Sequence, residues 1–203
     1  MEHKRLVEQG YDRIAERYLA SKGALGLETV ALLEALTSGL AADATVLDLG
    51  CGAGVPVTRW LAERFAVTDV DLSAQQLALA REAVPGATFV QGDMAAVEFS
   101  AASFAAIVSL YAIIHLPREE QSALLARIVS WLAPGGRFLA TWPVVAWEGE
   151  DRDWRGWGAA MWWSHHGSAE NLALLRDAGL SIEQAATRTE GDETWLWVLA
   201  RRA

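Results

Sequence analysis

The sequence lacks the features that mark a secreted or membrane protein. Cys51 is the one cysteine among 203 residues, so no disulfide can form within the chain, which suits a reducing cytosol. The longest apolar run, residues 104–116, is too short to cross a bilayer. The charged N-terminal residues MEHKRLVEQG do not resemble a signal peptide. We therefore expect a cytoplasmic protein that does not contact a membrane.

Positive charge is also scarce. Lys and Arg together number 17, against 26 for Asp and Glu, and the net charge is −9. An acidic surface repels phosphate backbones, so we expect no nucleic-acid partner and predict a small-molecule substrate. Such a surface accommodates cations and neutral molecules more easily. The adjacent His165 and His166 lack a nearby cysteine and a further histidine at helical spacing, so we predict no metal site.

What the sequence does contain is an alternation of strand-like and helix-like segments. Short apolar runs typical of buried parallel strands cover residues 44–50, 66–71, 87–93, 104–111 and 137–142. Helical patterns separate them, which predicts a doubly wound α/β sheet. Residues 181–189 and 194–202 follow as a hairpin, so the last pair of strands should be antiparallel.

The helical segments define the rest of the predicted organisation. We expect a helix over 117–133 that ends at Pro134-Gly135-Gly136, and a later helix over 169–178 capped by Ser168. Residues 1–40 read as a helical cover. No internal repeat is present, so the length fits one domain spanning residues 1–203.

A glycine-rich turn follows the first predicted strand, in the stretch VLDLGCGAG. Gly50 and Gly52 let the backbone turn tightly and approach a ligand, and the following helix presents free N–H groups. The spacing is G-x-G-x-G, whereas a dinucleotide site uses G-x-G-x-x-G. Asp48 precedes the first glycine by two residues, which disfavours a pyrophosphate and favours a cationic ligand.

Acidic residues also end the next two predicted strands. Asp71 stands where nucleotide-binding sheets accept hydrogen bonds from both ribose hydroxyls. Asp69, two residues earlier, is expected to face solvent. After the third strand, Asp93 can accept a hydrogen bond from an exocyclic amine, and Met94 can form an apolar wall against a purine.

Six stretches in order carry a family resemblance: YDRIAERY, VLDLGCGAG, VTDVDLS, FVQGDM, FAAIVSLYAIIHLP and LAPGGRFLAT, between residues 11 and 142. Together they resemble the class I S-adenosylmethionine-dependent methyltransferases, particularly small bacterial methyltransferase-domain proteins. The resemblance implies a Rossmann-like, seven-stranded sheet, mostly parallel with an antiparallel last strand and helices on both faces.

The resemblance also implies the cofactor, S-adenosyl-L-methionine, and the residues around it. Gly50 and Gly52 would lie under its methionine and ribose, Asp71 would hold the ribose and Asp48 would lie near the ammonium group. The full set of implied cofactor contacts is Tyr18, Asp48, Gly50, Gly52, Asp71, Leu72, Asp93, Met94 and Ser109.

Methyl transfer from a sulfonium mainly requires that a nucleophile be aligned and water excluded, with a general base only if the nucleophile carries a proton. His115, His165 and His166 are the candidate catalytic residues, and we expect one of them to contact the substrate. The alternatives are that His115 stabilises the turn before the helix at 117–133, and that the other two are ordinary loop residues.

Residues 143–167 form a tryptophan-rich segment after the fifth predicted strand, where we expect a lid over the substrate. Trp142 should be buried in the core. The predicted substrate contacts are Tyr11, Tyr111, Trp157, Trp162 and Trp163. Tyr11 lies on one helical face with Tyr18, and both could instead be core aromatics.

These observations predict methyl transfer to a small molecule with a nucleophilic nitrogen, oxygen or carbon atom. Two alternatives use the same scaffold: an enzyme such as a lyase or cyclase that does not transfer the methyl group, and a binding or regulatory protein. The glycine spacing and the terminal hairpin disfavour an NAD-dependent oxidoreductase. We expect a monomer or a homodimer.

Overall fold

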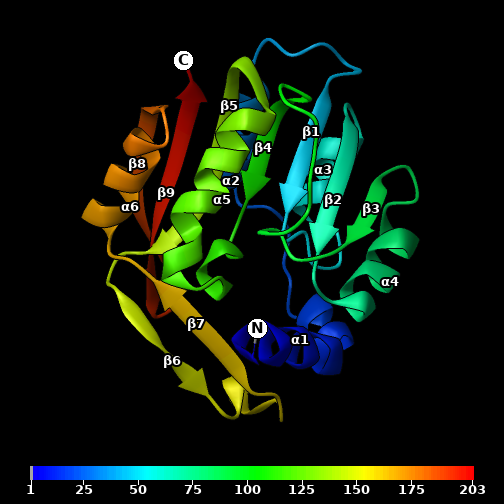
Figure 1. Ribbon diagram of the computed structural model, residues 1–203. Coiled ribbons are helices and arrows are strands. Elements are labelled where there is room, and N and C mark those ends of the chain that lie inside the picture. Colours follow the sequence, from blue (N-terminus) through cyan, green and yellow to red (C-terminus); the bar gives the residue numbers. More distant parts are fainter. Residues whose placement is uncertain (1) are drawn as a thin grey trace.

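The computed structural model describes residues 2–203, and its centre is a seven-stranded sheet of order β3-β2-β1-β4-β5-β9-β8 (Figure 1). β9 runs antiparallel to its neighbours β5 and β8, and the other pairings in this sheet are parallel. The strands are β1 (Thr45–Leu49), β2 (Ala66–Asp71), β3 (Thr88–Gln91), β4 (Phe104–Ser109), β5 (Leu132–Pro143), β8 (Leu180–Glu190) and β9 (Glu193–Arg202). The predicted Rossmann-like sheet with an antiparallel last strand is confirmed.

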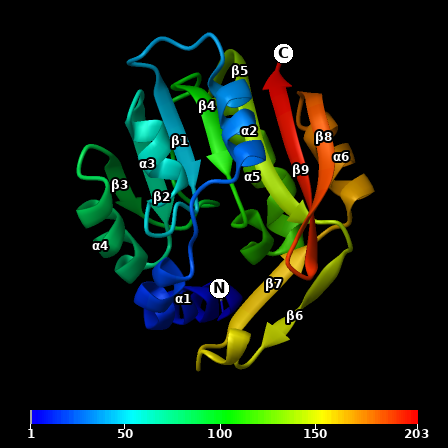
Figure 2. The same ribbon diagram turned by 180° about the vertical axis from the view of Figure 1, so that it is seen from behind.

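Helices cover both faces of the sheet (Figures 1 and 2). The helices are α1 (Glu2–Ala20), α2 (Leu27–Thr37), α3 (Val57–Ala62), α4 (Ala74–Ala83), α5 (Arg118–Trp131) and α6 (Ser168–Asp177). α2 and α3 lie on one face and α5 and α6 on the other, while α1 lies across the C-terminal ends of the central strands. None of the helices in residues 2–203 combines the length and apolar character that a membrane span requires.

The main core lies in the central strands, where Leu47, Leu49, Ile107 and Leu139 are 0% exposed. Strands covered by helices on both faces have no solvent-facing side, which explains why apolar runs in the sequence predicted them. Trp142 is 1% exposed and belongs to this core, as predicted.

Two predicted helix ends were wrong. α5 ends at Trp131, and the chain is already extended at Leu132 (φ −64°, ψ 137°), so Pro134-Gly135-Gly136 lies within β5. The cap of α6 is Gly167, whose backbone N–H donates to Glu170 Oε2 at 3.3 Å. Ser168 Oγ instead donates to the carbonyl of Val144.

The tryptophan-rich segment forms a separate antiparallel pair, β6 (Trp147–Asp151) and β7 (Met161–His165) (Figure 1). The short 3-10 turn η2 (Trp154–Gly156) lies between them, and η1 (Ile113–His115) precedes α5. β7 packs against α1 and makes a second hydrophobic cluster with the buried residues Val7, Ile14, Ala159, Met161 and Trp162. The aromatic density of this segment therefore supports the packing of α1.

Candidate active site

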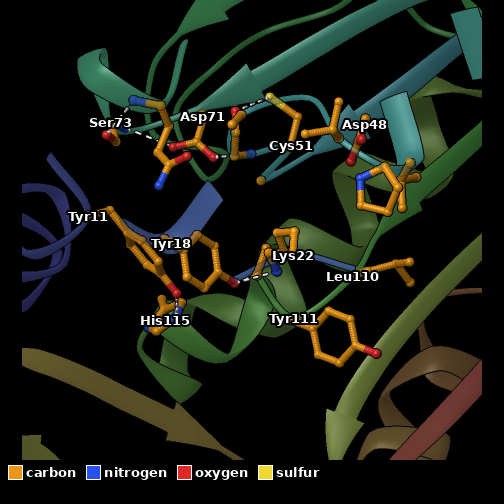
Figure 3. A pocket seen from close by; sticks show the side chains of 18 of the residues that line it. Tyr11, Tyr18, Lys22, Asp48, Cys51, Asp71, Ser73, Leu110, Tyr111 and His115 are labelled. Carbon is orange, nitrogen blue, oxygen red and sulfur yellow. Dashed lines mark hydrogen bonds between the residues drawn. The ribbon is translucent and has the colours of Figure 1, made fainter. Parts of the chain in front are cut away.

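A cavity of about 820 Å³ opens where β1, β2 and β4 end, between these strand ends and α1. The β8–β9 hairpin and the segment between α1 and α2 complete its lining. Figure 3 shows Asp71 and Cys51 on one side of this space, and Tyr18 and Tyr111 across from them. Ligands of open α/β sheets bind at this carboxyl edge.

The glycine-rich turn comes close to the residues behind it. Gly50 has φ +81°, and a Cβ atom there would lie 2.1 Å from the Cβ of Ala112. A side chain at this position is therefore excluded both by space and by backbone conformation. The N–H of Gly52 donates to Asp71 Oδ2 at 2.8 Å, which ties the turn to the end of β2.

Asp71 is held so that its carboxylate faces the cavity (Figure 3). Besides the bond from Gly52, its Oδ1 accepts the N–H of Ser73 at 2.9 Å. Burial raises the pKa of Asp71, and the backbone hydrogen bonds oppose that rise. Each carboxylate oxygen accepts more than one hydrogen bond, so both keep capacity for a ligand hydroxyl.

Asp48 and Asp69 form a buried carboxyl pair on neighbouring strands, bridged by Thr58. The hydroxyl of Thr58 lies 2.9 Å from Asp48 Oδ2 and 2.8 Å from Asp69 Oδ1. A hydroxyl has one hydrogen to donate, so satisfying both contacts requires a proton on one carboxyl group. Burial raises the pKa of Asp48 to about 7 and, together with the charge of Asp48, the pKa of Asp69 to about 8.

The expectation that Asp69 faces solvent was wrong, since this residue is 0% exposed. Asp69 lies opposite Asp48 in the β1–β2 register, in the middle of a sheet covered on both faces. A strand of this kind has no solvent-facing side, so the alternation of side chains along β2 could not predict whether Asp69 is buried or exposed.

The end of β3 brings Asp93 and Met94 to the cavity. Asp93 Oδ1 accepts the N–H of Ala95 at 2.9 Å, and its Oδ2 accepts from Lys4 Nζ at 2.7 Å. Lys4 also bonds to Glu120 on α5. Sequence reasoning missed Lys4, because the contact joins residues 89 positions apart and has no local signature. Leu72, from the end of β2, also lines the cavity.

Tyr11 and His115 form a hydrogen-bonded pair on the α1 side of the cavity (Figure 3). Tyr11 Oη lies 3.0 Å from His115 Nε2, and His115 Nδ1 lies 2.7 Å from the carbonyl oxygen of Trp162. A carbonyl only accepts, so the geometry assigns the ring proton to Nδ1 and leaves Nε2 to accept from Tyr11. Burial lowers the pKa of His115 to about 4, although the hydrogen bond to the Trp162 carbonyl partly opposes this shift. The ring is therefore neutral at pH 7.

The other two candidate histidines lie elsewhere. His165 is 5% exposed, and it pairs with Trp147 between β7 and β6. The Nδ1 atom of His166 lies 3.4 Å from Glu170 Oε2 at the start of α6. Of the three histidines, the described cavity lining contains His115.

Ser109 was expected to contact the cofactor, but it does not line the described cavity. Its side chain is 0% exposed, and its hydroxyl donates to the carbonyl of Leu49 at 2.8 Å, which ties β4 to β1. Tyr111, two residues on, does line the cavity, at φ +59°, and its N–H donates to Thr141 Oγ1. Ser109 is the last residue of β4 and Tyr111 lies in the turn after it, so the alternation of side chains along the strand does not continue to Tyr111.

The predicted lid tryptophans belong to the cluster around α1, away from the cavity lining that the structure describes, and Trp157 and Trp163 also pack against Trp154. Trp162 is 5% exposed and stacks on His3, with ring centroids 4.3 Å apart. Trp157 lies under Arg17, and Trp163 lies beside His115. Trp162 and Trp163 lie in β7, which packs against α1, and Trp157 precedes this strand in the same cluster.

Sequence reasoning missed a different aromatic wall. Trp195 and Trp197 of β9 line the cavity, and their rings lie edge-on to Tyr111 at centroid distances of 4.7 and 5.9 Å. Their spacing of two in a predicted strand was the available signal, because such residues share one face of a sheet. Besides Lys4, the cationic residues Lys22, Arg155 and Arg188 also line the cavity.

Comparisons with known proteins give one family. Residues 46–136 match a family model described as a methyltransferase domain. A trans-aconitate 2-methyltransferase of Paracidovorax citrulli is 40% identical over 100 residues, which cover 48% of this chain and 38% of that protein. The chain spans about two fifths of the length of the curated relatives it matches.

Solved structures share the architecture. An S-adenosylmethionine-dependent methyltransferase from Mesorhizobium loti superposes with a TM-score of 0.68 at 25% identity, covering 87% of this chain and 100% of that one. A 1,6-didemethyltoxoflavin N1-methyltransferase from Burkholderia thailandensis gives a TM-score of 0.77 at 21% identity, covering 100% and 89%. Residues 46–136 thus match a methyltransferase domain, and the glycine-rich turn, the strand order and these matches together support a class I S-adenosylmethionine-dependent methyltransferase.

Proposed function

We propose that this protein transfers the methyl group of S-adenosylmethionine to a nitrogen, oxygen or carbon atom of a small molecule. The observation that carries the proposal is the cavity itself. The glycine-rich turn and Asp71 stand on one side of it, and the Tyr11–His115 pair stands on the other. The match to a methyltransferase domain supports the reaction, and relatives named for small substrates support the acceptor class.

The residues at the strand ends fit the cofactor chemically. Asp71 would accept hydrogen bonds from the two ribose hydroxyls, and Asp48 would lie near the ammonium group. Gly50 and Gly52 leave the backbone open to close approach. Adenine would be held by Met94 and by Asp93, whose carboxylate can accept a further bond beside the one from Lys4. Leu72 and Tyr18 would complete the contacts.

The cofactor supplies, when bound, a methyl group on a positively charged sulfur, which a nucleophile can attack. The chain contributes orientation and exclusion of water, with α1 covering the strand ends. For an acceptor that carries a proton, Tyr11 Oη takes that proton while its own passes to His115 Nε2. The Trp162 carbonyl keeps Nδ1 protonated, so Nε2 is the atom with a lone pair for this step.

Transfer of a labelled methyl group tests the proposal. The protein would be incubated with S-adenosylmethionine carrying a deuterated methyl group and a small-molecule extract, and labelled products would be identified by mass spectrometry. We expect deuterated methyl in at least one small molecule, and none with heat-inactivated protein. Binding of the cofactor without any labelled product would contradict methyl transfer and would favour a binding protein or an enzyme of another reaction type.

A further inference from the structure

Two cationic side chains that line the cavity have no carboxylate partner among the described side chains. Lys22 lies between α1 and α2, and Arg155 lies in η2. The other two cationic lysine and arginine residues of the lining are paired: Lys4 with Asp93 and Glu120, Arg188 with Glu28. Among the side chains that the structure describes, which are those of residues 2–189 and 191–203, no salt bridge of 4 Å or less joins Lys22 or Arg155 to an acid.

Aromatic rings hold both cations and bring them to the same part of the wall. Lys22 Nζ lies 4.1 Å from the ring centroid of Tyr18 and 2.7 Å from its hydroxyl oxygen (Figure 3). Arg155 Cζ lies 4.8 Å from the ring centroid of Trp154. The Tyr18 and Trp154 rings are themselves neighbours, with centroids 5.8 Å apart. The two positive charges therefore flank one aromatic pair.

This wall borders the proton-accepting pair. The ring of Tyr11 lies 5.3 Å from that of Tyr18 and 5.9 Å from that of Trp154, between centroids. Burial raises the pKa of Tyr11 well above its ordinary value, and the positive charge of Arg155 opposes part of that rise. A group bound between the two cations would thus lie next to Tyr11.

Arg155 also stands in a backbone conformation that few side chains adopt. Its φ is +59°, in the left-handed region, where a residue other than glycine is strained. Such strain persists where the surroundings impose it, and it is concentrated at binding sites. The neighbouring Arg152 is 93% exposed, pairs with Glu150 and does not share this position at the cavity.

We infer that the acceptor carries an anionic oxygen group, a carboxylate or a phosphate, which Lys22 and Arg155 bind. The inference rests on the methyl-transfer function proposed above, and it specifies that the methyl acceptor is negatively charged. Unpaired cations facing a cationic cofactor repel it, and an anionic acceptor removes that repulsion when both are bound. Glu8 and Glu193 also line the cavity, but their carboxylates do not pair with either cation within the described residues.

The inference reverses the expectation from net charge. An overall charge of −9 favours a cationic or neutral ligand. The acids of the lining are concentrated at the strand ends, where Asp48, Asp71 and Asp93 would meet the cofactor. The wall across from them carries Lys22 and Arg155. Local charge at the binding site, and not the sum over the molecule, decides which acceptor enters.

Matched pairs of aromatic probes test the inference, chosen because Tyr111, Trp195 and Trp197 give the cavity an aromatic wall. The pairs are 4-hydroxybenzoate against 4-hydroxybenzamide, and phenyl phosphate against phenol. Binding to the full chain saturated with S-adenosylhomocysteine would be measured by calorimetry. We expect at least one anion to bind about tenfold more tightly than its neutral partner. The better anion identifies carboxylate or phosphate as the preferred group.

Variants connect this preference to the two residues. Lys22→Gln and Arg155→Gln should each weaken binding of the preferred anion by about tenfold and leave the neutral partner unchanged. Arg152→Gln is the matched control and should change neither. The preference should also shrink as salt is raised, because both cations are exposed to solvent.

The outcomes separate this inference from the function on which it rests. Equal binding of anions and neutral partners, or a preference that survives both substitutions, overturns the inference. So does the failure of every anion to bind while S-adenosylhomocysteine binds, and in each of these cases the proposed function stands. Failure of S-adenosylhomocysteine itself to bind the wild-type chain would overturn both.

Discussion

At the scale of single residues, the structure gives His115 a defined proton state. The Trp162 carbonyl holds the proton on Nδ1, and Tyr11 donates to Nε2. The sequence indicated a histidine after the fourth strand, but it could not supply this arrangement. Tyr11 and Trp162 come from segments 104 and 47 residues away, so their contacts depend on the tertiary fold.

Replacing His115 by Asn should lower kcat about 100-fold for an acceptor that must lose a proton, because Nε2 no longer takes the proton of Tyr11. Affinity for S-adenosylhomocysteine should change little. His166→Asn is the matched control, since His166 lies beside Glu170 and outside the cavity. Steady-state rates and calorimetry check both, and equal loss in the two variants would contradict the relay.

The buried pair of Asp48 and Asp69 makes stability depend on pH. The folded protein keeps a proton on this pair up to about pH 7 to 8, whereas the ordinary pKa of an aspartate is 3.8. Folding therefore takes up protons between about pH 4 and pH 8, and the free energy of unfolding falls as pH rises across that range. The slope is about 1.4 kcal/mol per pH unit for each proton taken up.

Asp69→Asn should flatten this dependence, because the variant lacks one of the two raised groups and Asp48 loses a neighbouring charge. Urea unfolding of the wild type and the variant at several pH values measures the slopes. Asp177→Asn, on an exposed position of α6, should keep the wild-type slope. A wild-type stability that is constant or rises between pH 4 and pH 8 would contradict a shared proton.

At the scale of elements, the parallel strands were predictable and the β6–β7 pair was not. β1 and β4 are largely apolar runs because helices cover both faces of the sheet. β6 reads WEGED and β7 reads MWWSH, so neither shows the regular pattern of a strand, and the burial of β7 comes from α1. The same contact explains why Trp157, Trp162 and Trp163, which were expected at the cavity, do not line it in the described structure.

The contact between α1 and β7 depends on Gly10. A Cβ atom there would lie 2.5 Å from the carbonyl oxygen of Ala160 and 3.0 Å from Met161 Cε. Gly10→Ala should therefore lower the melting temperature, although alanine favours a helix by about 1 kcal/mol over glycine. Gly86→Ala is the control, because nothing lies within 4 Å of its added atom. An unchanged or raised melting temperature for Gly10→Ala would show that the contact has room for a methyl group.

At the scale of the whole molecule, the two halves of the cavity differ in how far the sequence could reveal them. The half proposed for the cofactor consists of short motifs at strand ends, such as the turn at Gly50 and the acid at Asp71. The half proposed for the acceptor gathers Lys22, Arg155 and Trp195 from segments that are distant along the chain. Only the fold brings those residues together, so local patterns could predict the first half and not the second.

The central claim is that this cavity binds S-adenosylmethionine through the carboxylate at the end of β2. Calorimetric titration of S-adenosylhomocysteine into the wild type, Asp71→Asn and the exposed control Asp43→Asn tests it most directly. Hydrogen bonds to a charged acceptor contribute about 1.5 to 3 kcal/mol, so Asp71→Asn should bind about 10 to 100 times more weakly. Asp43→Asn should match the wild type. Equal affinity in all three proteins, or no binding to the wild type, would contradict the claim.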